Sequence, residues 1–324
     1  MRLLITLGLA TLAVLLVAEP AWAWGPGMHI LVGTEILAAL SLLPAAVASL
    51  LRAWPHDFLY GCIAADITFG KKYAPVGRNC HHWHVGEELY EAAETDRTRA
   101  CALGYLVHLA GDTIAHNIFL PRRLLTSANT QAIGHSYWEH RMDVHLGQSY
   151  MEAARHLITD FDQSHNDELM DRVLDRAVFS FQTNRRIFKG IINLANHDAW
   201  QAFFDRVLDN SRWDINDRQV NAWLRITFDF AMDYLDARGG SVPAQLDPTG
   251  EQALSEAKKL TREIGRRKTR HQTELEELAG ERFVMPEALG WWDKRLSAEG
   301  LWIDLVHLIA KPLEHEQEVE KSGA

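Results

Sequence analysis

One apolar stretch of the sequence, residues 103–115, carries two titratable side chains four residues apart, His108 and Asp112, and a third follows at His116. Positions i, i+4 and i+8 share one face of an α-helix and lie about 6 Å apart along its axis. A lone histidine there would be an ordinary core residue, but three titratable groups on an apolar face are costly to bury unless they are paired or bind a metal. The pattern therefore predicts a buried helix that presents metal ligands.

The rest of the chain also favours helices. Apolar residues recur at three- and four-residue spacing, whereas runs that alternate β-branched or aromatic residues with polar ones are nearly absent. Thr95 and Asp96 are expected to cap the helix just described, and Pro121 to end it. Further helices are expected at about 131–158, 166–194, 197–208, 217–237 and 251–282. The predicted fold class is all-α.

The first 23 residues have the pattern of a secretory signal peptide. Arg2 precedes an apolar run, and Ala21-Trp22-Ala23 forms a small-x-small cleavage site. Because the run is short and a polar chain follows it, we expect export to the periplasm or the medium, with cleavage between Ala23 and Trp24. An uncleaved N-terminal anchor is the alternative. Cleavage would make Trp24 the first residue of the mature chain.

Charge and cysteine content narrow the function further. The chain has 33 Lys and Arg against 43 Asp and Glu, a formal net charge of −10, which argues against generic electrostatic binding to nucleic acid or to anionic lipid. The three cysteines, Cys62, Cys80 and Cys101, form at most one disulfide in an oxidising compartment, or remain buried thiols.

Histidine is the unusual component, since eight of the 16 lie between residues 81 and 145. His135 and Glu139 are again four residues apart, so one helical turn lets both reach one ion. Imidazole and carboxylate suit a divalent ion such as zinc. Further potential ligands are Asp66, the run Cys80-His81-His82-Trp83-His84, and the pair Trp24 and His29.

In this order of ligands the sequence resembles the zinc-dependent phospholipases C, whose relatives include fungal single-strand nucleases, 3′-nucleotidases and the catalytic domain of glycosylphosphatidylinositol-specific phospholipase D. The resemblance covers residues 24–145 in ligand order and the helices to about 240 in general character. That family is all-α, exported, and begins its mature chain with a tryptophan whose amino nitrogen and carbonyl oxygen bind zinc. The sequence from Trp24 to His29 is similar to this start.

The resemblance implies a multi-helix bundle around three zinc ions. The three ligand groups it suggests are Trp24, His29 and Asp112; Asp66, His81, His108 and Asp112; and His116, His135 and Glu139. Asp112 would bridge the first two ions. His81 is preferred because of its distance from Asp66 along the chain, and His82, directly before Trp83, is the alternative ligand.

The same resemblance implies the chemistry. A zinc-bound hydroxide would attack phosphorus, the third zinc would stabilise the leaving oxygen, and Asp66 would be both a ligand and the general base. The short spacing from His108 to His116 is similar to that in the phospholipase D domain, and Glu139 stands where the nucleases have aspartate, so lipid is favoured over nucleic acid. We expect transient contact with a membrane surface and infer no protein partner.

Two other functions remain open. One is a single-strand nuclease or 3′-nucleotidase, for which Trp83, Tyr137 and Trp138 could stack bases, although packing is the simpler interpretation. The other is a non-catalytic exported zinc-binding protein, whose metal would need only four closed ligands.

Turn-forming residues concentrate between 239 and 250 and predict a domain boundary. We therefore expect a catalytic domain at 24–245 and a helical C-terminal extension at 246–324. The basic run 266–270 is expected to be a solvated helix face rather than a lipid contact. The aromatic residues around Trp291 and Trp302 are expected to pack against the body.

Overall fold

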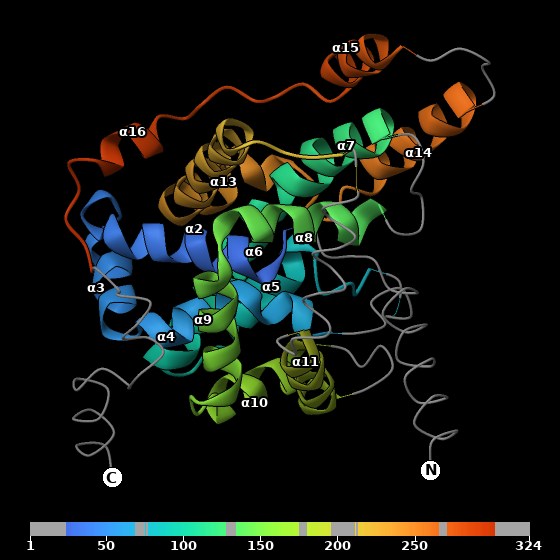
Figure 1. Cartoon of the computed structure of the whole chain (residues 1–324). Coiled ribbons are helices and arrows are strands. Elements are labelled where there is room, and N and C mark those ends of the chain that lie inside the picture. Colours follow the sequence, from blue (N-terminus) through green and yellow to red (C-terminus); the bar gives the residue numbers. More distant parts are fainter. Residues whose placement is uncertain are drawn as a thin grey trace, which may run out of the picture.

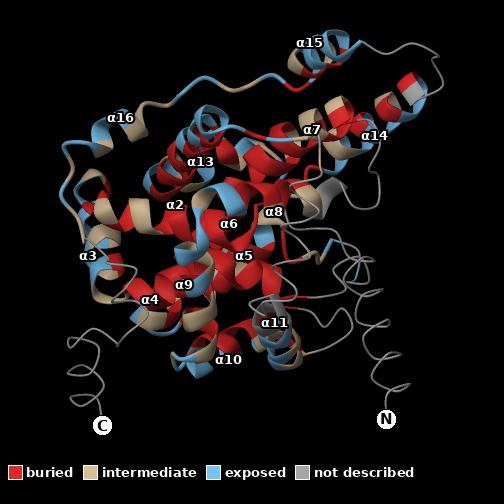
Figure 2. Ribbon diagram, in the orientation of Figure 1, coloured by how far each residue is buried: buried red, intermediate tan, exposed pale blue. Residues whose placement is uncertain are grey.

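The computed structural model describes residues 24–68, 75, 77–127, 134–174, 180–195, 211, 213–265 and 271–301. These residues form helices, helical turns and loops and contain no strand, so the all-α prediction is confirmed. Figure 1 shows the helices packed around α6, and Figure 2 shows that buried residues concentrate on α6 and on the helices beside it.

The helices from the start of the described chain to the middle are α2 (Pro26–Ala38), α3 (Ala45–Ala53), α4 (Pro55–Ala64), α5 (Trp83–Glu91), α6 (Asp96–Ile114), α7 (Leu120–Ser127), α8 (Gly134–Leu146) and α9 (Gln148–Thr159). Those that follow are α10 (Ser164–Val173), α11 (Phe181–Ala195), α13 (Asp217–Ala237), α14 (Glu251–Gly265), α15 (Gln272–Arg282) and α16 (Trp291–Arg295). Short helical turns are η1 (Leu40–Leu42), η2 (Ala65–Ile67), η4 (Ala115–Phe119), η5 (Arg238–Gly240) and η6 (Pro243–Gln245).

Helix α6 is the central helix of the bundle. Every residue from Ala100 to Ile114 is buried, because α2, α4, α5 and α13 pack around it. The helix begins with a capping box, in which the Thr98 backbone N–H donates to Thr95 Oγ1 at 3.2 Å and the Thr95 N–H donates to Thr98 Oγ1 at 3.1 Å. The predicted cap at Thr95 is therefore confirmed, and the potential ligands on α6 lie inside the core.

Two glycines allow α4 and α6 to cross with their backbones in contact. A Cβ at Gly61 would lie 2.0 Å from the Cys101 carbonyl oxygen, and a Cβ at Gly104 would lie 2.0 Å from the Phe58 carbonyl oxygen. The crossing brings the end of α4 and the η2 turn, which carries Asp66, beside α6. This close approach sets the spacing between the potential ligands on the two elements.

The expected helix end at Pro121 is wrong. The chain stays helical through the π turn η4, where the Leu120 N–H donates to the Ala115 carbonyl, and continues into α7. A proline has no N–H, and its ring would collide with the carbonyl four residues earlier in a regular α-helix. The wider π turn just before Pro121 accommodates this conflict, and it contains His116.

The predictions of the other helices are confirmed in part. The prediction at 217–237 coincides with α13. Within the stretch 131–158, the residues from 134 onward form two helices rather than one, because Gly147 adopts a φ of +92° between α8 and α9. The stretches 166–194 and 251–282 contain α10 with α11 and α14 with α15, respectively. The predicted helix at 197–208 and the basic run 266–270 lie outside the described residues.

Residues after the predicted boundary pack closely on the bundle. Helix α14 lies against α7 and η4, and α15 lies against α7. The buried carboxylate of Asp229 on α13 accepts backbone N–H groups from Leu289, Gly290 and Trp292 at 2.6–2.9 Å. The Leu301 N–H then donates to the Leu37 carbonyl of α2 at 2.7 Å. The boundary itself stays a prediction.

The aromatic residues of this segment rest partly on the body. Trp292 is half-buried, with its ring centroid 5.3 Å from that of Phe228, and Trp291 is also half-buried, whereas Trp302 lies outside the described residues. Cys62, Cys80 and Cys101 are buried thiols that form no disulfide with one another. Among the described residues, no helix combines the length and the apolar character that crossing a bilayer requires.

The Gly104→Ala variant tests the crossing of α4 and α6. The added Cβ would collide with backbone rather than with a movable side chain, so we expect the free energy of unfolding to fall by about 3 kcal/mol. The matched control is Gly190→Ala in α11, where a Cβ meets nothing within 4 Å, and we expect a gain of about 0.5–1 kcal/mol. Urea denaturation measures both, and equal effects would contradict the proposed role of the crossing.

Candidate metal centre

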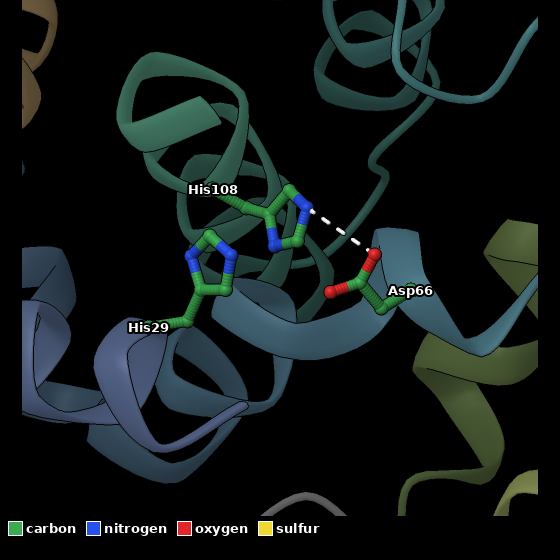
Figure 3. A group of neighbouring side chains, drawn as sticks. All are labelled: His29, Asp66 and His108. Carbon is green, nitrogen blue, oxygen red and sulfur yellow. Dashed lines mark ion pairs between the residues drawn. The ribbon is translucent and has the colours of Figure 1, made fainter. Parts of the chain in front are cut away.

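Five buried side chains converge around α6, and none is more than 3 % exposed. They come from four parts of the chain: His29 from α2, Asp66 from η2, His81 from the turn before α5, and His108 and Asp112 from α6. Figure 3 shows that His29 and His108 lie side by side, with Asp66 next to His108. The four elements thus bring together residues up to 83 positions apart in sequence, from His29 to Asp112.

Asp112 lies at the middle of this cluster. Its Oδ2 is 3.2 Å from His108 Nε2 and 3.3 Å from His81 Nε2. Its Oδ1 is 3.5 Å from His29 Nε2. The two oxygens of one carboxylate therefore face different histidines. Asp66 Oδ1 lies 3.4 Å from His81 Nε2 and 3.8 Å from His108 Nε2.

The hydrogen bond of His108 fixes which of its nitrogens is available. His108 Nδ1 lies 2.9 Å from the Cys62 carbonyl oxygen, which can only accept, so Nδ1 carries the hydrogen. In the neutral ring, Nε2 then presents a lone pair into the cluster, where it lies 3.2 Å from His81 Nε2. His81 Nδ1 in turn contacts Cys80 Sγ at 3.3 Å. Imidazole nitrogens that converge on carboxylates in this way are arranged for a shared cation.

The pKa values of Asp112 and His29 are both shifted below their usual values. Burial acts to raise the pKa of Asp112, but the charge of His108 and the contacts with His108, His29 and His81 outweigh it and hold this pKa well below its usual range. Burial and the neighbouring His108 lower the pKa of His29. A charged carboxylate beside a neutral imidazole is the protonation state that a metal ligand needs.

The cluster fits a divalent metal ion. Both oxygens of Asp112 and Nε2 of His29 are buried and receive no hydrogen bond from any described residue. Two overlapping groups place one ligand atom of each member within 4.8 Å of the others, namely His29, Asp66 and His108, and His81, His108 and Asp112. Nitrogen and carboxylate oxygen donors at such spacing are those of zinc sites.

Trp24 lies at the edge of the cluster. Its side chain is fully buried, and its indole N–H donates to the Gly111 carbonyl at 3.1 Å, one residue before Asp112. The indole also packs against Phe119, with ring centroids 4.7 Å apart. These contacts hold the predicted first residue of the mature chain against the C-terminal end of α6 and the π turn η4.

The third predicted ligand group is described only in part. His116 is buried in the π turn, with Nδ1 4.0 Å from Asp112 Oδ2. Glu139 is buried on α8. His135 belongs to the first turn of α8, but its side chain lies outside the described residues.

The structure separates His81 from its neighbour His82. His82 precedes the first residue of α5, is half-buried, and places Nδ1 3.3 Å from the Gly77 carbonyl. Its ring lies 5.3 Å from the ring of exposed His84, away from the Asp112 cluster. Of the two alternatives, the structure brings only His81 into the cluster.

Asp143 is a buried residue of this region that the sequence analysis missed. It accepts backbone N–H groups of Gly27 and Met28 at 3.2 and 3.1 Å, and so caps α2, whose own first turn has no acidic residue. Burial raises its pKa to about 7. A Cβ at Gly25 would lie 2.0 Å from Asp143 Oδ2. The sequence signal that could have identified Asp143 is its position four residues after the candidate ligand Glu139.

The aromatic residues considered as a stacking platform have structural contacts. Trp138 is buried, and the Trp83 indole N–H donates to the Leu246 carbonyl at 2.8 Å while its ring stacks on Tyr234. The Tyr137 hydroxyl donates to the Trp213 carbonyl and is hydrogen-bonded to Ser211 Oγ at 2.8 Å. These contacts favour the packing interpretation.

Comparison with known families identifies this region. The model of the family described as zinc-dependent phospholipase C matches residues 28–188. Residues 28–188 belong to the zinc-dependent phospholipase C family. The match includes every candidate ligand except Trp24, which precedes it. Family membership implies a phosphodiester hydrolase. Searches of curated proteins and of solved structures give no match.

Asp112→Asn tests the centre of the cluster. Because one amide oxygen replaces two charged oxygens that face different histidines, we expect bound zinc to fall by about two equivalents and activity to be lost. The control is Asp229→Asn, which alters another buried carboxylate, one that binds backbone N–H groups, and is expected to keep its zinc. Atomic absorption measures both, and unchanged zinc in Asp112→Asn would contradict the assignment.

Proposed function

We propose that this protein is an exported phospholipase C that hydrolyses the phosphodiester of a phospholipid, releasing diacylglycerol and a phosphorylated head group. The observation that carries the proposal is Asp112, a buried carboxylate whose two oxygens face His29 on one side and His81 with His108 on the other. Its place within the family match points to phosphodiester chemistry. The lipid substrate follows from the family, and a transient membrane contact follows from the substrate.

Three zinc ions are proposed for this centre, with the ligands suggested by the sequence. The first ion would be held by Trp24 and His29, and the second by Asp66, His81 and His108. Asp112 would be a ligand of both of these ions. The third ion would be held by His116, His135 and Glu139. Bound zinc supplies Lewis acidity toward phosphoryl oxygens and lowers the pKa of water toward neutrality. The overlapping of the two His and Asp groups supports adjacent ions rather than one isolated site.

The protonation states of His29 and Asp112 and the position of Asp66 suit phosphodiester hydrolysis. The lowered pKa values of His29 and Asp112 keep the former neutral and the latter charged at neutral pH. Asp66 lies beside His81 and His108, where its carboxylate can accept the proton of an attacking water. The burial of all these groups limits solvent access, which strengthens their electrostatic effect on the substrate phosphate.

Export is proposed from the signal-peptide pattern of residues 1–23. Cleavage before Trp24 would create an amino terminus on a residue whose indole is already fixed beside Asp112 by the Gly111 carbonyl. The burial of Trp24 supports a new terminus at this position, because its indole is bonded to Gly111, the residue next to Asp112.

Substrate turnover separates this proposal from a nuclease. We expect the purified zinc-loaded protein to release phosphorylated head group from phosphatidylcholine in mixed micelles at least about 100-fold faster than it cleaves single-stranded DNA. Chelation should abolish the activity and zinc should restore it, which is the control for metal dependence. Rapid DNA cleavage without lipid turnover would instead establish the nuclease alternative.

N-terminal sequencing together with zinc analysis tests processing and metal content. For protein recovered after export, we expect a chain that begins at Trp24 and binds about three zinc ions. A Trp24→Ala variant with the same cleavage site should lose packing against Phe119 and bind zinc more weakly. One zinc per chain or none, in the unaltered protein, would favour the non-catalytic zinc-binding alternative.

A further inference from the structure

The turn at residues 246–250 lies against the π turn that carries His116, although the sequence places it at a domain boundary. The Pro248 carbonyl accepts a hydrogen bond from His116 Nδ1 at 2.6 Å, and the Asp247 carbonyl accepts one from Asn117 Nδ2 at 2.7 Å. We call residues 246–250 the His116 clamp. It joins a candidate ligand to a segment 132 residues further along the chain.

The conformation of the His116 clamp is stabilised by hydrogen bonds within the turn itself. Asp247 Oδ1 accepts the Thr249 backbone N–H at 3.0 Å, and its Oδ2 accepts the Thr249 hydroxyl at 2.6 Å. The Gly250 N–H closes the turn on the Asp247 carbonyl at 3.1 Å. Asp-Pro-Thr-Gly is thus a locally stabilised turn. On its other side, the Leu246 carbonyl accepts the Trp83 indole N–H.

Gly250 makes the closest contact with His116. Its φ is +56°, a conformation that favours glycine, and a Cβ there would lie 2.5 Å from both the Cβ and the carbonyl oxygen of His116. Any other residue at this position would push the turn away from the π turn. The Pro248 carbonyl could then no longer reach the imidazole.

A carbonyl oxygen can only accept, so the contact with Pro248 places the His116 hydrogen on Nδ1 and leaves the Nε2 lone pair for a ligand. Backbone carbonyls that fix the tautomer and orientation of an imidazole in this way strengthen its metal binding.

We propose that the His116 clamp is a positioning segment of the metal centre, which orients His116 and presents its Nε2 to the third zinc ion. This inference rests on the proposed function, because it assigns His116 to zinc. It also means that residues after the predicted boundary at 245 belong functionally to the catalytic unit.

The test compares Gly250→Ala with Gly290→Ala in the full-length protein. Gly290 also has a positive φ, +82°, but a Cβ there meets nothing within 4 Å, so both variants bear backbone strain and only Gly250→Ala displaces the clamp. We expect Gly250→Ala to bind its third zinc ion about 10–100-fold more weakly, and Gly290→Ala to bind it normally. Competition with a chelator measures the affinity.

A second readout does not depend on metal. In zinc-free protein, the His116 Nδ1–H should give a slowly exchanging imidazole NMR signal, which Gly250→Ala should lose. If Gly250→Ala does not fold, Asn117→Ala serves instead, because it removes only the bond to the Asp247 carbonyl and one helical side-chain bond. Loss of the signal with three zinc ions still tightly bound would overturn the positioning role.

The outcomes also separate this inference from the proposed function. Unaltered protein that shows the Nδ1–H signal but binds fewer than three zinc ions would contradict the three-zinc proposal, and the zinc role of the clamp with it. Unaltered protein that binds three ions, together with a Gly250→Ala variant that binds them equally well, would overturn the clamp alone.

Discussion

The burial of a charged Asp112 inside the central helix is the constraint on which the rest of this structure depends. A carboxylate without solvent is stable only if opposite charge or hydrogen-bond donors surround it closely. Here the imidazoles of His29, His81 and His108 surround it, and each comes from a different element. No described residue donates a hydrogen bond to the two oxygens of Asp112, so a cation bound by these nitrogen and oxygen donors, as in a zinc centre, would offset the cost of burying the charge.

The packing of helices around α6 positions the side chains that surround Asp112. Without side chains at Gly61 and Gly104, α4 approaches α6 closely enough for the Cys62 carbonyl to orient His108 and for Asp66 to join the cluster. At the other side, Asp143 binds the first turn of α2, the helix that carries His29. Helix contacts that look purely structural thereby determine where the ligand atoms lie.

The segments beyond the family match are connected to the same centre. Residues 28–188 carry the family pattern, yet the Pro248 carbonyl orients His116, and Leu301 is hydrogen-bonded to α2. Helix α14 packs directly on the π turn. The candidate ligand His116 therefore depends, in this chain, on a backbone group that lies well outside the region matched by the family.

The sequence alone determined the helical fold class, the cap at Thr95, the extent of α13 and the placement of His108 and Asp112 on one helical face, because each depends on contacts within a few residues. Only the tertiary structure decided that His81 rather than His82 enters the cluster, that Asp143 caps α2, that a π turn passes Pro121, and that the Pro248 carbonyl orients His116. Each of these depends on how elements distant in sequence pack against one another, and the spacing of residues along the chain does not predict that packing.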